Sequence, residues 1–185
     1  AWSILRLPPK ERDLYEHHLE ESRVVLIRTM ISDQLPYINI AKRWFTIPDL
    51  AEIRSRKIGA GRIGGKAAGM LLAHRILENE IPEENQASVN KPEYFFIGSN
   101  EMYSFHALNA LDKWNDQKYK TEEKMREDYP LIVDEFIKSQ FPSDILERLK
   151  DILEQVGDKP LIVRSSSLLE DSFGTSFAGK YESFF

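Results

Sequence analysis

The sequence predicts a helix-rich α+β fold, and three of its features carry this prediction. Long stretches of the 185-residue chain set apolar residues among charged ones at helical spacing. Serine or threonine stands before several of these stretches, where its side chain can cap a helix. Runs of β-branched and aromatic residues typical of strands are short and lie late in the chain, at about residues 94–97, 161–163 and 181–185.

The first 60 residues are expected to form a helical N-terminal extension. Residues 10–33 mix charged and apolar side chains without glycine or proline, which predicts one long helix that Pro36 ends or redirects. Thr46 and Asp49 have the spacing of a capping box, so another helix is predicted to begin there.

Further helices are predicted over about residues 66–80, 99–114, 121–140 and 143–157. Thr121 and Ser143 are the expected caps of the last two, and Gly157 is placed to stop the final helix. Pro130 is expected to interrupt the helix that Thr121 begins, because proline has no N–H to donate.

Composition excludes several classes of function. A formal net charge of −5 argues against a general nucleic-acid binder, which needs an excess of lysine and arginine. The absence of cysteine excludes disulfides and thiolate metal sites and fits a cytoplasmic protein. No apolar run approaches the roughly 18 residues that span a bilayer. The histidines are interpreted as structural or solvated, and no cluster of His, Asp and Glu has metal-ligand spacing.

A glycine-dense segment, Gly61-Arg62-Ile63-Gly64-Gly65-Lys66, opens the helix predicted after it. Glycines let backbone N–H groups approach an anion, and a helix N-terminus adds unpaired donors and a positive dipole end. The segment is not a P-loop, because the lysine is not followed by Ser or Thr, and no strand is predicted before it. A phosphate site and a flexible linker that enters a helix are the two interpretations.

Arg164-Ser165-Ser166 directly follows the strand candidate Leu161–Val163. Ligands of α/β sheets gather at the carboxyl edge of strands, and the arginine fork suits phosphate oxygens. An ion pair of Arg164 with Glu170 or Asp171 is the alternative. Residues 172–179 set small residues around two aromatic ones, which suits either a loop that closes over a ligand or a plain hairpin connection.

Together these segments resemble the phosphoenolpyruvate synthase and pyruvate phosphate dikinase family. The resemblance covers roughly residues 63–185 and departs from the family's pattern at Ser167-Leu168-Leu169 and Lys180. Its matching segments, in chain order, are Gly64-Gly65-Lys66-Ala67-Ala68-Gly69, Ile162-Val163-Arg164-Ser165-Ser166, Glu170-Asp171, Ser176-Phe177-Ala178-Gly179 and Glu182-Ser183-Phe184.

The resemblance implies that residues 61–185 are the N-terminal part of an ATP-grasp nucleotide-binding domain. It also implies catalytic roles for Lys66 and Arg164, which would contact the phosphates of ATP. The other residues that it assigns to the nucleotide are Gly64, Gly65, Ser165, Ser166, Ser176, Phe177, Ala178 and Gly179.

The family's reaction passes a phosphoryl group from ATP through a carrier histidine to pyruvate. The resemblance places that histidine and the ligands of Mg²⁺ outside this chain. Because the chain lacks an initiator methionine and ends as a strand begins, it is expected to be a piece of a longer enzyme and inactive alone.

Two further hypotheses stay open. In one, the same ATP-binding half serves another acceptor, such as an antibiotic or a glucan. In the other, the chain is a non-catalytic relic whose helical N-terminus binds a partner. The sequence does not predict the oligomeric state.

Overall fold

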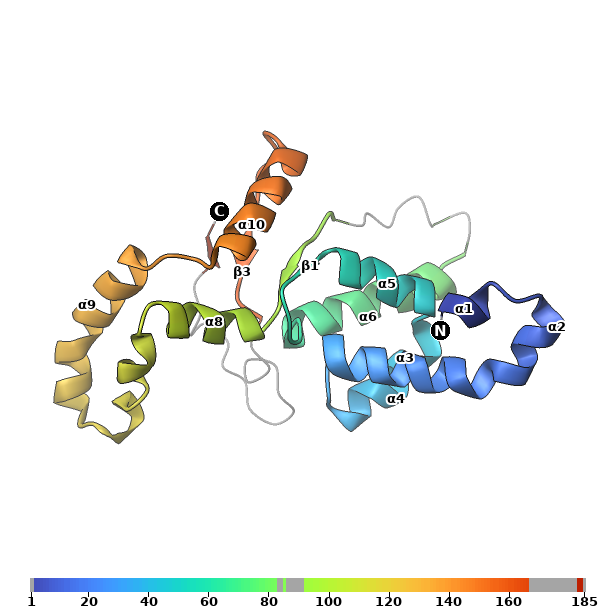
Figure 1. Cartoon of the computed structure of the whole chain (residues 1–185), viewed down its shortest axis with the longest axis horizontal. Helices are drawn as coiled ribbons and strands as arrows, with labels where there is room; N and C mark the ends of the chain where they lie inside the picture. The colour runs from blue at the N-terminus through green and yellow to red at the C-terminus, as the bar shows by residue number, and fades with distance from the viewer. Residues whose placement is uncertain (1, 83–84, 86–91, 167–182, 185) are drawn as a thin grey trace. The chain divides into compact units, whose positions relative to one another are not determined.

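A computed structural model describes residues 2–82, 85, 92–166 and 183–184 (Figure 1). The chain divides into two compact units, one of Ala1–Gly98 with Pro160–Phe185 and the other of Ser99–Lys159. The described residues are mostly helical and their strands are short, as a helix-rich α+β fold requires. The division into an extension before residue 61 and a nucleotide-binding part after it stays a prediction.

The first unit begins with a series of helices. Their bounds are α1 Trp2–Leu5, α2 Pro9–Arg12, the 3-10 turn η1 Asp13–Tyr15, α3 Glu16–Met30, α4 Leu35–Trp44 and α5 Ile47–Ser55. The prediction of one helix over residues 10–33 was wrong, since η1 separates α2 from α3. Pro36 lies in the first turn of α4, where its missing N–H costs nothing because first-turn N–H groups have no helical acceptor.

The capping box predicted at Thr46 is confirmed at the start of α5. The N–H of Asp49 donates to Thr46 Oγ1 at 3.4 Å, and the N–H of Thr46 donates to Asp49 Oδ2 at 2.7 Å. Two backbone donors that a helix start would leave unpaired are thus satisfied by neighbouring side chains.

A parallel strand pair and one helix carry the glycine-dense segment. β1 (Lys57–Ile58) leads through the glycines into α6 (Gly65–Glu80), and β2 (Phe96–Ile97) then pairs with β1 in parallel. Parallel neighbours require such a crossover. The predicted strand over residues 94–97 is therefore confirmed at its second half, whereas β1, with one β-branched residue in two, was not predicted.

One hydrophobic core joins the helices before the glycines to α6 after them. In Figure 1, α3 and α4 lie side by side in blue. The two helices contact each other, α3 also contacts α5, and α4 also contacts α6. The buried residues of this core are Ile27, Met30, Ile31, Ile38, Ala41, Phe45, Leu50, Ile53, Ile63, Ala67, Ala68, Leu71 and Phe96.

A second strand pair also belongs to the first unit. β3 (Val163–Arg164) pairs antiparallel with β4 (Ser183–Phe184), with Val163 opposite Phe184. Strands were predicted at both places, and their described parts are two residues long.

The second unit is helical. Its elements are α8 Asn100–Leu108, the 3-10 turns η2 Leu111–Trp114 and η3 Gln117–Tyr119, α9 Glu122–Lys138 and α10 Ser143–Val156. Thr121 caps α9 as predicted. The prediction that Pro130 interrupts this helix was wrong, since α9 continues through it although proline donates no hydrogen bond. Ser143 does not cap α10, because Pro142 occupies the capping position, and Gly157 ends that helix at a φ of +63°.

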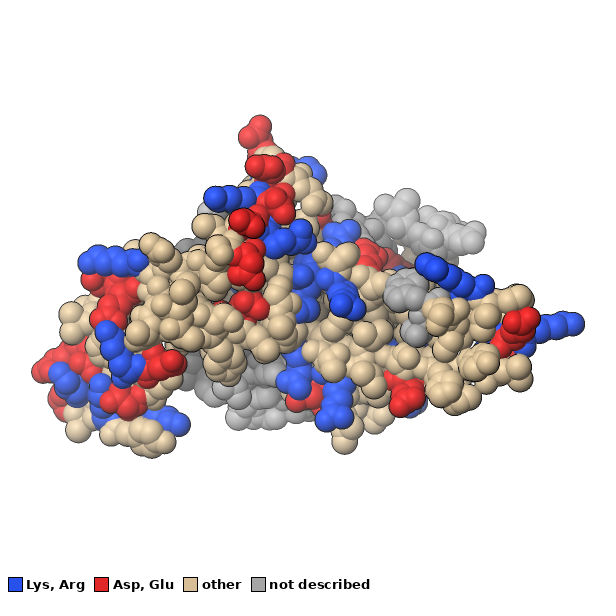
Figure 2. All heavy atoms as spheres, viewed as in Figure 1, with Lys and Arg blue, Asp and Glu red and all other residues tan. Residues whose placement is uncertain are grey.

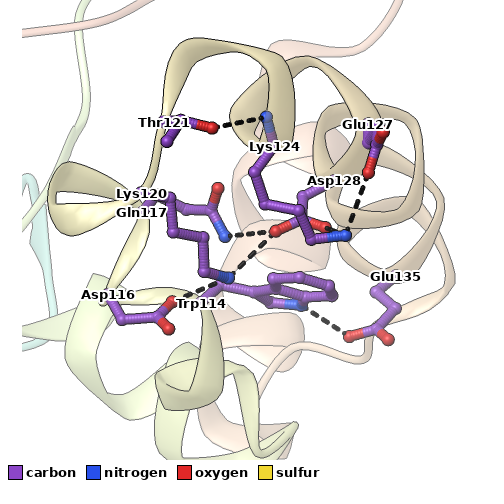
Figure 3. A network of polar contacts seen from close by, with 9 residues as sticks. All are labelled: Trp114, Asp116, Gln117, Lys120, Thr121, Lys124, Glu127, Asp128 and Glu135. Atoms are coloured by element: carbon purple, nitrogen blue, oxygen red, sulfur yellow. Dashed lines mark hydrogen bonds and ion pairs between the residues drawn. The ribbon is translucent and has the colours of Figure 1, made fainter.

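Asp128 on α9 is the centre of a polar network in this unit (Figure 3). Its side chain is buried and accepts hydrogen bonds from Lys120 Nζ at 2.9 Å and Gln117 Nε2 at 3.1 Å, and it pairs with Lys124 Nζ at 3.2 Å. The bonds from Lys120 and then Gln117 lower the pKa of Asp128 to about 2. The carboxylate thus fastens η3 to α9.

The solvent face of α9 carries both signs of charge. Figure 2 shows acidic and basic side chains intermixed over this helix. Among its ion pairs are Glu122 with Arg126 and Asp134 with Lys138, each at 2.6 Å. Such exposed pairs contribute little to stability and leave the helix well solvated. None of the described helices is long and apolar enough to cross a bilayer.

Candidate functional site

The glycine loop, residues 59–64, connects the end of β1 to the N-terminus of α6. Gly59, Gly61 and Gly64 all have positive φ, a conformation that glycine adopts without strain. The sequence predicted no strand before this loop, and β1 corrects that expectation. A loop between a strand and a helix N-terminus is the setting in which backbone amides meet phosphates.

Gly64 is the first residue of interest, because it caps α6 without a side chain. Its φ of +83° and ψ of 171° lie in a region almost confined to glycine. Gly65 and Lys66 then form the first turn, and both are half-buried. First-turn N–H groups have no acceptor within the helix, so this turn is a concentration of donors beside the lysine charge.

Ser166 joins this helix start from a distant part of the sequence. The N–H of Ala67 donates to Ser166 Oγ at 3.1 Å, across 99 positions of the chain. The backbone carbonyl of Ser166 lies so close to Gly64 that any Cβ there would collide with it. The structure therefore brings together two of the segments that the sequence singled out.

Arg164 and Ser165 enter this region with Ser166. Arg164 lies on β3, opposite Ser183, and its side chain is exposed; Ser165 is half-buried. One residue, Ser165, separates the arginine from the serine that contacts α6. The predicted loop residues Ser176, Phe177, Ala178 and Gly179, and the alternative partners Glu170 and Asp171, lie outside the described residues.

The chemistry of this donor set suits an anion. It consists of backbone amides, the ammonium of Lys66, the guanidinium of Arg164 and the hydroxyls of Ser165 and Ser166. Phosphate oxygens accept from all of these groups, whereas Mg²⁺ takes oxygen ligands, mostly carboxylates and waters. In the part of the chain that the structure describes, no group of three His, Cys, Asp or Glu could hold a metal ion.

The C-terminal end of α3 anchors the loop, which the sequence did not predict. The N–H of Ile63 donates to the carbonyl of Met30 at 3.1 Å. Arg62 donates through Nε to the carbonyl of Arg28 at 3.1 Å and pairs through Nη2 with Asp33 at 2.9 Å. Arg62 is thus engaged with protein groups on the side of the loop that faces α3.

Tyr37 on α4 contacts α6 one turn beyond Gly64. Its hydroxyl donates to the carbonyl of Ala68 at 2.9 Å, and burial raises the pKa of Tyr37 well above its ordinary range. No local pattern marks this residue, because its partner lies 31 positions away.

Of three comparisons with known proteins, one gives a match. Neither curated proteins nor solved structures give a significant match to the chain. The family model described as "Pyruvate phosphate dikinase, AMP/ATP-binding domain" matches residues 60–185, which begin in the glycine loop and include Ser166. The chain therefore belongs to the family of the AMP/ATP-binding domain of pyruvate phosphate dikinase.

Proposed function

We propose that the chain is the ATP-binding part of a phosphotransferase of the phosphoenolpyruvate synthase and pyruvate phosphate dikinase type, built on an ATP-grasp domain. The single observation that carries the proposal is the meeting of Ser166 with the N-terminus of α6. This contact supports the proposal because Lys66 lies in the first turn of α6 and Arg164 lies two positions before Ser166 in the chain. Family membership supplies the nucleotide as the anion.

The role of each residue follows from the charge on the substrate. Gly64 and Gly65 let the backbone approach the phosphates closely. In the first turn of α6 the N–H of Ala67 donates to Ser166, and the N–H groups of Gly65 and Lys66 would face the phosphates. Lys66 and Arg164 supply positive charge to the phosphates as negative charge shifts during transfer. The removal of one such positioned donor costs roughly 3 kcal/mol of transition-state stabilisation.

The rest of the reaction belongs to groups outside the described residues. ATP would transfer its β- and γ-phosphoryl groups together to a carrier histidine and release AMP. The γ-phosphoryl group would then pass to water or inorganic phosphate, and the histidine would pass the remaining phosphoryl group to pyruvate. If the intact enzyme binds Mg²⁺, the ion would neutralise negative charge on the phosphates. The donors at the glycine loop suit an anion and do not fit a divalent cation, so the ligands of Mg²⁺ are expected outside this donor set.

The first experiment measures ATP binding by titration calorimetry with single variants of the two cations. Lys66→Ala and Arg164→Ala should each weaken ATP binding roughly ten- to hundredfold, as expected for charge-assisted hydrogen bonds. Arg126→Ala and Lys138→Ala on α9 are matched controls, because both side chains are exposed and pair with acids one turn away on the same helix. They should change the affinity less than twofold.

The second experiment tests the reaction in the enzyme that contains this chain. AMP formation from ATP should depend on pyruvate and should be lost in Arg164→Ala while circular dichroism stays unchanged. Wild-type ATP affinity in both cation variants would refute the site, and AMP formation without pyruvate dependence would refute the acceptor.

A further inference from the structure

We propose that α3 and α4, which precede the residues matched by the family, hold the glycine loop in the shape that binds nucleotide phosphates, with Tyr37 as a positioning residue. The proposal rests on the proposed function for the identity of the ligand. It adds to it a part of the chain, residues 16–44, that neither the resemblance nor the family match assigns to the site.

The first support is the way in which α3 ends. The last four carbonyls of a helix receive no hydrogen bond from within the helix, so they need donors from elsewhere. The glycine loop supplies two of these donors, the N–H of Ile63 to Met30 and the guanidinium of Arg62 to Arg28. The loop is therefore fixed to α3 by the backbone of Ile63 and by the side chain of Arg62.

The second support is the core beneath the loop. Ile63 is 4% exposed, and Ala67 and Ala68 on the first turns of α6 are also buried. They belong to the same buried cluster as Ile27 and Met30 of α3. A shift of α3 would displace the side chain of Ile63, and the glycines next to it would have to follow.

The third support is Tyr37. Its hydroxyl reaches the carbonyl of Ala68, which also accepts the helical N–H four residues later. This contact fixes the rotation of α6 about its axis near the first turn. The phosphate-binding N–H groups lie on that turn, so their direction depends on a hydroxyl from α4.

Tyr37→Phe tests the proposal, because it removes the hydroxyl and keeps the ring in the core. Tyr119→Phe is the control, since Tyr119 is 81% exposed and lies in the other unit. Two readouts are taken on the full chain below its melting temperature. One is amide hydrogen exchange over residues 59–72 without nucleotide, and the other is the dissociation constant of ATP compared with that of adenosine.

We expect faster exchange over the first turns of α6 in Tyr37→Phe and roughly fivefold weaker binding of ATP, the size of one net hydrogen bond, with adenosine binding unchanged. Tyr119→Phe should match the wild type. Equal weakening for ATP and adenosine would show a general loss of fold, and wild-type exchange with wild-type ATP affinity would show no coupling; either result overturns the proposal. If the wild-type chain binds no ATP, the proposed function fails, while hydrogen exchange still decides whether Tyr37 holds α6.

Discussion

Gly64→Ala is the sharpest perturbation that the structure offers. The added Cβ meets the backbone carbonyl of Ser166, and the φ of +83° with a ψ of 171° is a conformation that alanine avoids. Backbone strain of this kind costs about 1–3 kcal/mol. Separation of the two segments would also remove the bond from Ala67 to Ser166, for about 1 kcal/mol more. The free energy of unfolding should therefore fall by roughly 2–4 kcal/mol.

Gly69→Ala is the matched control, since it makes the same chemical change five residues along the same helix. Gly69 is exposed, lies inside α6, and has no atom within 4 Å of an added Cβ. Alanine is the better helix former by up to about 1 kcal/mol, so this variant should be more stable than the wild type.

Urea unfolding, followed by circular dichroism, measures both variants, and calorimetric titration with ATP measures the site. Gly64→Ala should unfold at lower urea and bind ATP more weakly, because the start of α6 and Ser166 can no longer share their present positions. A Gly64→Ala protein with wild-type stability and wild-type ATP affinity would refute the close approach of Ser166 on which the site is built.

Three smaller perturbations test other contacts. Ser166→Ala should cost about 1 kcal/mol in urea unfolding and weaken ATP binding, because the N–H of Ala67 loses its acceptor. Thr46→Ala should cost about 1 kcal/mol through the loss of the capping box with Asp49, and should leave ATP affinity unchanged. Asp128 has a pKa of about 2 in the folded protein, below its ordinary 3.8, so its contribution to stability is present above pH 4 and lost as the pH falls toward 2. In Asp128→Asn the free energy of unfolding should therefore depend less on pH between 4 and 2 than in the wild type. An unchanged pH dependence would contradict the network.

Local chemistry made part of the fold and site predictable. The capping box of Thr46 and Asp49 needs only residues three positions apart, and the start of α6 needs only glycines before an apolar helix. The association of this start with Arg164-Ser165-Ser166 followed from the resemblance, since a contact across 99 positions leaves no periodic signal.

Proline shows why other elements could not be predicted. Pro36 is equally suited to end a helix or to occupy the first turn of a new one, and the choice here depends on Tyr37 and Ile38, which face the core and α6. Pro130 lies within α9, which continues on both sides of it in spite of the lost hydrogen bond. In both cases the surroundings decide, and a local pattern does not contain them.

The helices before residue 60 escaped recognition for a related reason. A phosphate site demands particular residue types, such as the glycines, lysine and arginine of the site proposed above, so its sequence is recognisable. The helices that support such a site need only backbone carbonyls at the right place and apolar side chains, here the carbonyl of Met30 and the side chain of Ile27. Many different sequences supply both. The family match accordingly begins at residue 60, although the core that supports the glycine loop begins more than thirty residues earlier, at Ile27. The boundary of a recognisable motif therefore does not mark the boundary of the physical unit that makes the motif work.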